Sequence, residues 1–118
     1  MAELQLGRFE YCLKVAELGR SLEFYRKLGF EMIGGVLDEG WAIVRHSDCT
    51  LGLFQGHIAT NLLNFRGGDV FAIAKELRAR GLELNREAQT EDDGSAAAEI
   101  HDPDGNRIYF NTFPGEEP

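Results

Sequence analysis

Cysteine is scarce in this sequence, which has only Cys12 and Cys49 among its 118 residues. Two thiols so far apart in the chain provide neither a disulfide framework nor a CxxC metal-binding motif. We therefore expect both thiols to be reduced, as in a cytoplasmic protein.

Long apolar runs are also absent. No stretch of about 18 apolar residues occurs, which is the length that a membrane-spanning helix requires. The first six residues, Met1 to Leu6, have no basic segment ahead of an apolar one, so they do not resemble a secretory signal. We expect no membrane partner and no export.

Basic residues are outnumbered, with 12 Lys and Arg against 20 Asp and Glu, and the formal net charge is −8. Nucleic-acid binding needs a basic face that neutralises phosphates, so this balance argues against a nucleic-acid partner. An acidic protein favours cationic over anionic small ligands. The length and the hydrophobic content of 43% fit one compact domain, residues 1–118.

The first half of the chain predicts a βαβββ module over residues 9–55. Alternating apolar residues predict strands at 9–15, 30–35, 41–45 and 51–54. Ser21 is a suitable N-cap for a helix that presents Leu22, Phe24, Tyr25 and Leu28 at helical spacing. Gly29 is placed to end that helix in a left-handed conformation.

The second half, residues 61–113, repeats this order. Strands are predicted at 62–66, 96–101 and 107–112, and a further strand is predicted to start with residues 82–84. Asp69 is the expected N-cap of a helix whose apolar stripe is Val70, Ile73, Ala74 and Leu77, and Gly81 is expected to end it. Adding 52 to a residue number maps Tyr11 onto Leu63 and Gly29 onto Gly81. The sequence therefore predicts an α+β fold of two related modules.

Three stretches carry a resemblance to a known family: residues 21–30 (Ser-x-x-Phe-Tyr-x-x-Leu-Gly-Phe), the helix at 69–81 and the turn Asp-Pro-Asp-Gly-Asn at 102–106. They resemble the vicinal oxygen chelate superfamily of glyoxalases, ring-cleaving dioxygenases, and fosfomycin and bleomycin resistance proteins. The resemblance covers residues 9–113. It implies two curved sheets whose troughs enclose the site, and a homodimer. These are helix and turn residues, so they indicate the fold better than the activity.

In that fold, strand alternation divides the side chains between two faces. Tyr11, Leu13, Val15, Leu63, Phe65, Ile108 and Phe110 are expected beneath the helices. The trough-facing, candidate ligand-binding residues are Glu10, Cys12, Gly52, Phe54, Leu62, Asn64, Tyr109 and Asn111. Trp41 is added as a further stacking residue.

The resemblance also implies where a divalent metal would be held in metal-dependent members. Those four positions fall on Glu10, Gly52, Leu62 and Tyr109, of which only Glu10 is an ordinary ligand. A transition-metal site needs about three or four N, O or S donors. The histidines have no HxxH or HxH spacing and are interpreted as surface residues: His46, His57 and His101. We expect no metal and no other cofactor.

The preferred hypothesis is binding of a small organic ligand without chemistry, as in resistance proteins of the bleomycin type. Trp41, Phe54 and Tyr109 offer stacking surface, and Glu10 offers a carboxylate for a cation. Each aromatic residue taken singly is more often a core residue. The position of Phe54 and Tyr109 on the trough face is what favours a ligand.

Two enzymatic alternatives remain open from the sequence. In the first, a metal-free isomerase or lyase uses Glu10 as base and Tyr109 as acid. Cys12 on the same face is a third candidate, but no histidine in its strand neighbourhood activates it, so a buried hydrophobe is the favoured interpretation. In the second, a glyoxalase-like or dioxygenase-like metalloenzyme uses a displaced site.

Overall fold

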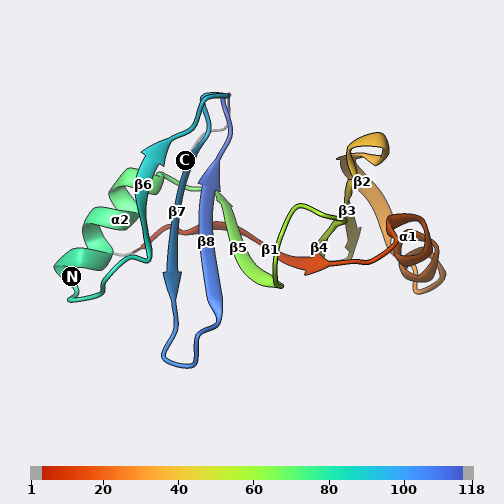
Figure 1. The fold of residues 1–118 in the computed structure, drawn as a ribbon, viewed down its shortest axis with the longest axis horizontal. Coiled ribbons are helices and arrows are strands. Elements are labelled where there is room, and N and C mark those ends of the chain that lie inside the picture. The colour runs from red at the N-terminus through yellow and green to blue at the C-terminus, as the bar shows by residue number, and fades with distance from the viewer. Residues whose placement is uncertain (1–3, 116–118) are drawn as a thin grey trace. The chain divides into compact units, whose positions relative to one another are not determined.

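The computed structural model describes residues 4–115, which form two compact units. The first unit comprises residues 10–62, and the second comprises residues 63–115 together with residues 4–9. Each unit has the element order βαβββ and consists of a mixed sheet with one helix (Figure 1). The predicted α+β fold class is confirmed.

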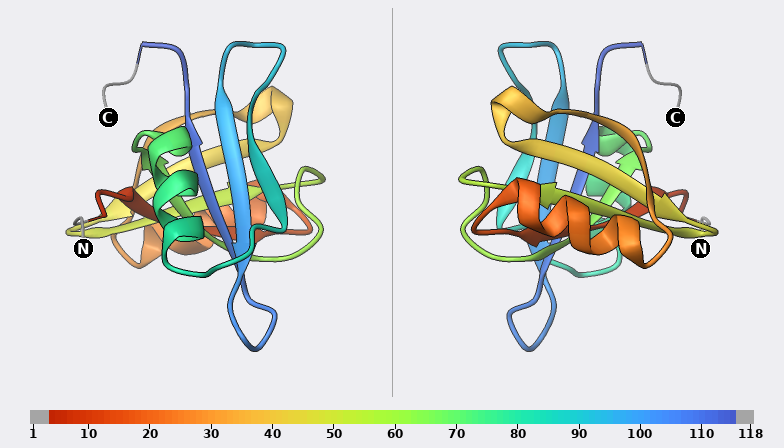
Figure 2. Two further views of the ribbon diagram at one scale, coloured as in Figure 1. Left: turned by 90° about the vertical axis from the view of Figure 1, so that its left-hand side faces the viewer. Right: turned by 90° about the vertical axis from the view of Figure 1, so that its right-hand side faces the viewer.

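The first unit has its strands in the order β2-β3-β4-β1. In this sheet β1 pairs with β4 in parallel, whereas β3 runs antiparallel to both β2 and β4. The helix α1 lies on one side of this sheet (Figure 2). The elements are β1 (Gly7–Lys14), α1 (Leu18–Lys27), β2 (Glu31–Val36), a single 3-10 turn (Leu37–Glu39), β3 (Trp41–His46) and β4 (Cys49–Phe54).

The second unit repeats this topology, with the strand order β5-β8-β7-β6. Here β5 and β8 are parallel, and the other neighbours are antiparallel. The helix α2 again covers one side of the sheet (Figure 2). The elements are β5 (Leu62–Gly67), α2 (Val70–Ala79), β6 (Arg86–Thr90), β7 (Ala96–His101) and β8 (Arg107–Thr112).

The apolar core of each unit lies between its helix and its sheet, as strand alternation predicts. In the first unit Leu18 and Leu22 of α1 pack against Val44 and Leu53, which are 0% exposed. The residues predicted to lie beneath the helices do pack against the two cores at six positions: Tyr11, Leu13, Val15, Phe65, Ile108 and Phe110. Leu63 is half-buried.

The start of α1 differs from the prediction. Ser21 is not the N-cap, because the helix begins at Leu18 and the Ser21 backbone N–H already donates to the carbonyl of Glu17. Glu17 occupies the N-cap position without a side-chain cap. Burying Leu18 stabilises the unit by roughly 1.5–3 kcal/mol, which exceeds the roughly 1 kcal/mol that a serine cap contributes. Packing therefore sets this helix start.

The ends of both helices and the start of α2 agree with the prediction. The Asp69 carboxylate accepts a hydrogen bond from the Ala72 backbone N–H at 3.1 Å. Gly29 and Gly81 have φ angles of +103° and +84°, in the left-handed region that ends a helix. The apolar stripe of α2 is buried as expected, at Val70, Ile73, Ala74 and Leu77.

The predicted start of the next strand at residues 82–84 is wrong. Leu82 is exposed, and its backbone N–H caps α2 by donating to the carbonyl of Leu77. Pairing with β7 begins only at Asn85, whose N–H donates to Glu99, and β6 spans Arg86–Thr90. Residues 82–84 are used in crossing from the helix layer to the sheet edge, which an apolar alternation of three residues does not reveal.

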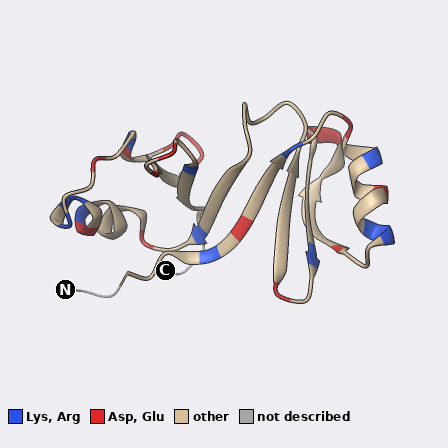
Figure 3. Cartoon of the chain, turned by 90° about the horizontal axis from the view of Figure 1, so that it is seen from below, with Lys and Arg blue, Asp and Glu red and all other residues tan. Residues whose placement is uncertain are grey.

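The outward surface of α1 is charged. Basic and acidic bands are both visible on this helix (Figure 3). Arg20 pairs with Glu17 at 3.0 Å, and Lys27 pairs with Glu23 at 3.3 Å. Such exposed pairs contribute little to stability and keep the face solvated. Within residues 4–115 no helix has the length and apolar character needed to cross a membrane.

Candidate functional site

The open face of the first sheet, opposite α1, carries five of the predicted site residues. Glu10 and Cys12 come from β1, Trp41 from β3, and Gly52 and Phe54 from β4. The strand register places Cys12 beside Gly52, and Trp41 beside Phe54. Their neighbours along each strand belong to the core beneath the helix. Alternation alone had assigned four of these residues to this face, and the register adds Trp41.

Trp41 and Phe54 form a stacked pair on this face. Their ring planes are 3° apart and their centroids are separated by 6.1 Å. His57 stands edge-on to Phe54 at 6.2 Å, and its Nε2 contacts the Glu39 carbonyl. Both stacked residues are half-buried, so each still presents aromatic surface to solvent. The sequence predicted His57 to be a surface residue and did not place it in the site, because it follows β4 in a loop.

Gly52 leaves room for the Phe54 ring to lie back over the sheet. A Cβ atom on Gly52 would be 2.6 Å from Cε2 of Phe54, 3.3 Å from Sγ of Cys12 and 3.4 Å from Cδ1 of Ile43. The first of these separations is shorter than any ordinary carbon–carbon contact. Any side chain at position 52 would therefore push the Phe54 ring away from its present place beside Trp41.

Cys12 is buried on this face, next to a buried carboxylate. The exposed fractions of Cys12 and Glu10 are 4% and 8%. Burial, and secondarily the negative charge of Glu10, raises the pKa of the Cys12 thiol to about 12. A thiol with such a pKa is almost entirely protonated at neutral pH and is a poor nucleophile. The interpretation of Cys12 as a small buried hydrophobe is supported.

Thiol labelling of the native protein tests this difference between the two cysteines. At pH 8 only about one Cys12 side chain in ten thousand is a thiolate, given its pKa of about 12. Cys49 is exposed. We expect a thiol-specific aromatic disulfide reagent to modify one thiol per native chain and two in denaturant. Rapid modification of two thiols in the native state would contradict the burial of Cys12, and a Cys49→Ser variant identifies the reactive residue.

The open face of the second sheet carries three further predicted residues. Asn64 of β5 pairs in register with Tyr109 of β8, and Asn111 follows two residues along the same strand. The Tyr109 hydroxyl accepts a hydrogen bond from Nη1 of Arg86 at 3.1 Å. Burial is the main cause that raises the pKa of Tyr109. Leu62, the remaining predicted residue, begins β5 and is buried.

A charged network on this face was not anticipated. Glu99 accepts from Nε and Nη2 of Arg107 at 3.1 and 2.8 Å and lies 2.7 Å from Nε2 of His101. The Arg107 hydrogen bond is the main cause that lowers the pKa of Glu99. Alternation along the last two strands could have located Glu99 and Arg107. Arg86, which also pairs with Glu91, could not be located because its strand was misplaced.

The three histidines are exposed, as predicted: His46, His57 and His101. Across residues 4–115, no group of three or more His, Cys, Asp and Glu side chains is positioned to hold a metal ion.

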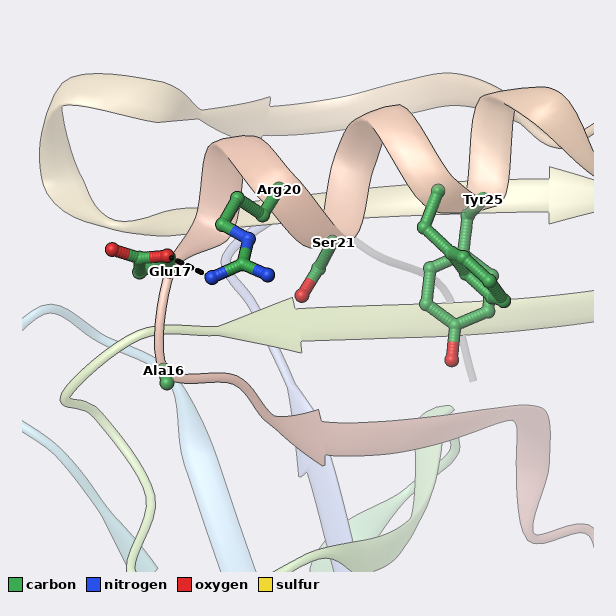
Figure 4. A pocket seen from close by; sticks show the side chains of 6 residues that line it. Ala16, Glu17, Arg20, Ser21 and Tyr25 are labelled. Atoms are coloured by element: carbon green, nitrogen blue, oxygen red, sulfur yellow. Dashed lines mark hydrogen bonds and ion pairs between the residues drawn. The ribbon is translucent and has the colours of Figure 1, made fainter.

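A shallow hollow also lies beside the first turns of α1 (Figure 4). Glu17 and Arg20 project into it and form an ion pair at 3.0 Å. The remaining lining residues are Ala16, Ser21, Phe24 and Tyr25. Since its two charged groups satisfy each other, and none of its residues is a predicted site residue, the open sheet faces are the better candidates.

Residues 7–110 match the sequence model of the Glyoxalase/Bleomycin resistance protein/Dioxygenase superfamily. No curated protein is significantly similar in sequence to the chain.

Similar folds occur among solved structures at low sequence identity. A protein described as an NAD-dependent benzaldehyde dehydrogenase from Legionella pneumophila is 17% identical, with a TM-score of 0.74 over 89% of this chain and 98% of that chain. A glyoxalase/bleomycin resistance protein/dioxygenase superfamily member from Vibrio splendidus 12B01 is 17% identical, with a TM-score of 0.65 over 89% and 97%. A hypothetical protein from Bacillus halodurans C-125 is 13% identical, with a TM-score of 0.67 over 97% of both chains. At these identities the similarity shows the fold alone.

Proposed function

Because the chain belongs to the Glyoxalase/Bleomycin resistance protein/Dioxygenase superfamily, we propose that it binds a small, flat, cationic organic ligand on the open face of its first sheet. The observation that carries this proposal is the stacked pair of Trp41 and Phe54, which leaves half-buried aromatic surface on the face of the first sheet opposite α1. The pairing of two chains that the resemblance implies is kept as part of this proposal.

The aromatic pair suits a flat ligand. Offset stacking on a tryptophan or phenylalanine ring is worth about 0.5–1.5 kcal/mol beyond the area buried. A cation over the face of a tryptophan ring gains a further contribution of similar size, about 0.5–2 kcal/mol, from the ring quadrupole. Gly52 supports this arrangement because any larger residue there would move Phe54.

Charge supports a cationic ligand over an anionic one. Glu10 places a carboxyl group on the same face as Trp41 and Phe54, on a strand beside β4. The formal net charge of the chain is −8, which attracts cations at a distance. An anionic ligand of the same size would be repelled both by the Glu10 carboxylate and by the net negative charge of the chain.

The same proposal assigns no divalent metal to the site. Among the four positions where metal-dependent relatives would be expected to hold an ion, Gly52 has no side chain and Leu62 is apolar. At the fourth, Tyr109 accepts a hydrogen bond from the cationic Arg86, which opposes a second cation there. Glu10 alone cannot supply about three or four ligands. The residues present therefore do not fit the ion.

An acid/base reaction by Glu10 and Tyr109 has less support. A general acid works best when its pKa lies near the working pH. Burial raises the pKa of Tyr109 above its already high ordinary value, and its hydroxyl oxygen is held by Arg86. Tyr109 is therefore poorly suited to donate a proton at neutral pH.

Trp41 is the single tryptophan of the sequence, so intrinsic fluorescence reports directly on this face. We expect N-methylquinolinium, a flat cation, to quench Trp41 saturably, and 2-naphthoate, an anion of similar size, to bind more weakly. Phe54→Ala removes one stacking partner and is expected to weaken N-methylquinolinium binding about threefold to tenfold. Glu10→Gln is expected to reduce the preference for the cation.

Two controls make this measurement decisive. N-acetyltryptophanamide shows collisional quenching only, which rises linearly and does not saturate. Phe71→Ala removes an exposed aromatic residue of α2, a helix that carries none of the proposed site residues, and is expected to leave the affinity unchanged. Linear quenching of the protein, indistinguishable from that of the free fluorophore, would overturn the proposal.

A further inference from the structure

The sequence contains two Asp-Gly pairs, Asp93-Gly94 between β6 and β7 and Asp104-Gly105 between β7 and β8. Glycine has no Cβ, so its backbone nitrogen can approach the carboxyl group of the preceding aspartate with little steric hindrance. Both aspartates are exposed, and the two glycines have almost equal φ angles of +87° and +86°. Any difference in reactivity between the pairs must therefore come from their contacts.

The Asp93 carboxylate is held in place by Ser95. Oδ1 of Asp93 accepts a hydrogen bond from the Ser95 hydroxyl at 2.6 Å and another from the Ser95 backbone N–H at 2.8 Å. The hydroxyl first, and then the backbone N–H, lower the pKa of Asp93 and keep the group ionised. Before the Gly94 nitrogen can bond to this carboxyl group, both hydrogen bonds must break and a proton must be gained. Asp93 is therefore a poor electrophile.

The Asp104 carboxylate has no such restraint, since within residues 4–115 it makes no hydrogen bond or ion pair. This turn is held closed by a different residue, Asp102. The Asp102 carboxylate accepts from the backbone N–H groups of Asp104 and Asn106 at 2.9 and 2.8 Å. The Asp102 carbonyl oxygen accepts from the Gly105 N–H at 3.0 Å. The Asp104 side chain is thus free to react whenever the hydrogen bonds to Asp102 open.

We propose that Asp104 is a modification site, at which the chain converts its own aspartyl linkage into an isoaspartyl linkage, and that Asp102 sets the rate. The Gly105 nitrogen forms a bond to Cγ of Asp104 and loses its proton, while the carboxyl group loses a hydroxyl. One water molecule leaves, and a five-membered succinimide ring closes. Water then adds to the backbone carbonyl carbon of Asp104 and breaks the bond from that carbon to the Gly105 nitrogen. The chain now runs through Cγ, and its composition is unchanged.

The product alters the hairpin of β7 and β8. An isoaspartyl linkage adds one carbon atom to the backbone of the turn and displaces the N–H groups that donate to Asp102. The pair that closes this hairpin is His101 with Arg107, and Arg107 also forms the ion pair with Glu99. The modification is therefore expected to weaken the hairpin. This inference goes beyond the function proposed above and is independent of it, because none of these residues belongs to that binding site.

The experiment ages the whole native chain at 37 °C and pH 6 and follows both Asp-Gly pairs in one peptide. Trypsin releases residues 87–107, which contain both pairs, and electron-transfer fragmentation identifies which aspartate has become isoaspartate. We expect isoaspartate to form about fivefold to tenfold faster at Asp104 than at Asp93, the equilibrium factor for one hydrogen bond. The chain unfolded in guanidinium chloride is the control, and there both pairs are expected to react at similar rates.

Two outcomes of this experiment would overturn the proposal. One is a native chain in which Asp93 reacts as fast as Asp104 or faster. The other is a native chain that forms no isoaspartate at Asp104 while the unfolded chain forms it over the same period.

Matched substitutions separate the two turns. Asp102→Ala removes the carboxylate that closes the second turn and is expected to raise the rate at Asp104 about fivefold to tenfold, leaving Asp93 unchanged. Ser95→Ala removes the hydroxyl that holds Asp93 and is expected to raise the rate at Asp93 alone. If Asp102→Ala fails to fold, Asp102→Asn keeps an acceptor oxygen and is expected to give a smaller increase. An unchanged rate at Asp104 in a folded Asp102 variant would contradict the role of Asp102.

Discussion

Replacing Gly35 by alanine is expected to lower the free energy of unfolding by about 3–4 kcal/mol, the largest loss that we predict for a single methyl group. Gly35 lies in β2 with φ of +111°, where any residue with a Cβ is strained. Its added Cβ would be 2.5 Å from Cα of Ala42 and 2.6 Å from the carbonyl oxygen of Trp41. These are backbone atoms of the neighbouring strand and cannot rotate away.

The consequence reaches the proposed binding face. β2 pairs with β3 through a register shift between Met32 and Gly34, after which Gly35 faces Ala42 and Val36 faces Trp41. A Cβ at position 35 would push β2 away from the segment of β3 that carries Trp41. We therefore expect Gly35→Ala to weaken N-methylquinolinium binding as well as stability.

Gly81→Ala is the matched control for the contact with β3. Gly81 has a similar positive φ of +84°, but an added Cβ would have no atom within 4 Å. The decrease in the free energy of unfolding caused by Gly81→Ala should be limited to the conformational cost of about 1–2 kcal/mol. Urea denaturation of both variants gives the difference between them, which isolates the backbone clash. If both variants lost the same free energy of unfolding, the added Cβ at position 35 would be accommodated without a significant clash with Ala42.

Replacing Glu99 by glutamine is expected to cost about 1–3 kcal/mol at pH 7, the range for hydrogen bonds to charged groups. The Glu99 side chain is 12% exposed and receives two hydrogen bonds from Arg107, with His101 also in contact. Glutamine keeps the shape and one acceptor but loses the charge. Arg107, itself 28% exposed, then remains on the face without its ion pair with Glu99.

This pair also predicts a pH dependence of stability. The hydrogen bond from Arg107 lowers the folded-state pKa of Glu99, whereas an unfolded glutamate titrates near about 4.3. A lowered folded pKa means that the contribution is complete above about pH 4.3 and is lost as the pH falls through the folded pKa. Urea denaturation at pH 7 and at pH 3 should therefore show a smaller acid-dependent loss in Glu99→Gln than in the unaltered protein.

The control for this pH experiment is Glu83→Gln, which neutralises an exposed glutamate of the same unit. We expect its stability to follow that of the unaltered protein at both pH values. If Glu99→Gln also followed the unaltered protein at every pH, the ion pair with Arg107 would contribute nothing to folding.

Several features were determined by the sequence because their causes are local. A position that requires a positive φ favours glycine, so the helix ends at Gly29 and Gly81 could be located from the residue type at each position. Strand side chains alternate with a period of two, so the core-facing residues Leu13 and Phe110 and the open-face residues Phe54 and Tyr109 could be assigned to opposite faces. These assignments also produced most of the candidate site residues.

Other features depended on contacts between residues far apart in the chain, and only the tertiary structure decided them. Leu18 begins α1 because it is buried against the sheet, not because of a nearby cap. The stack of Trp41 on Phe54 depends on the register between β3 and β4. The hydrogen bond from Arg86 to Tyr109 depends on β6, a strand with an irregular register whose start was predicted too early, at residues 82–84. In the described part of the chain, the buried Oδ1 atoms of Asn64 and Asn111 are left without a hydrogen-bond partner by the groups that their neighbours supply in space. A sequence lists its donors and acceptors, but only the folded chain determines which of them remain without a partner.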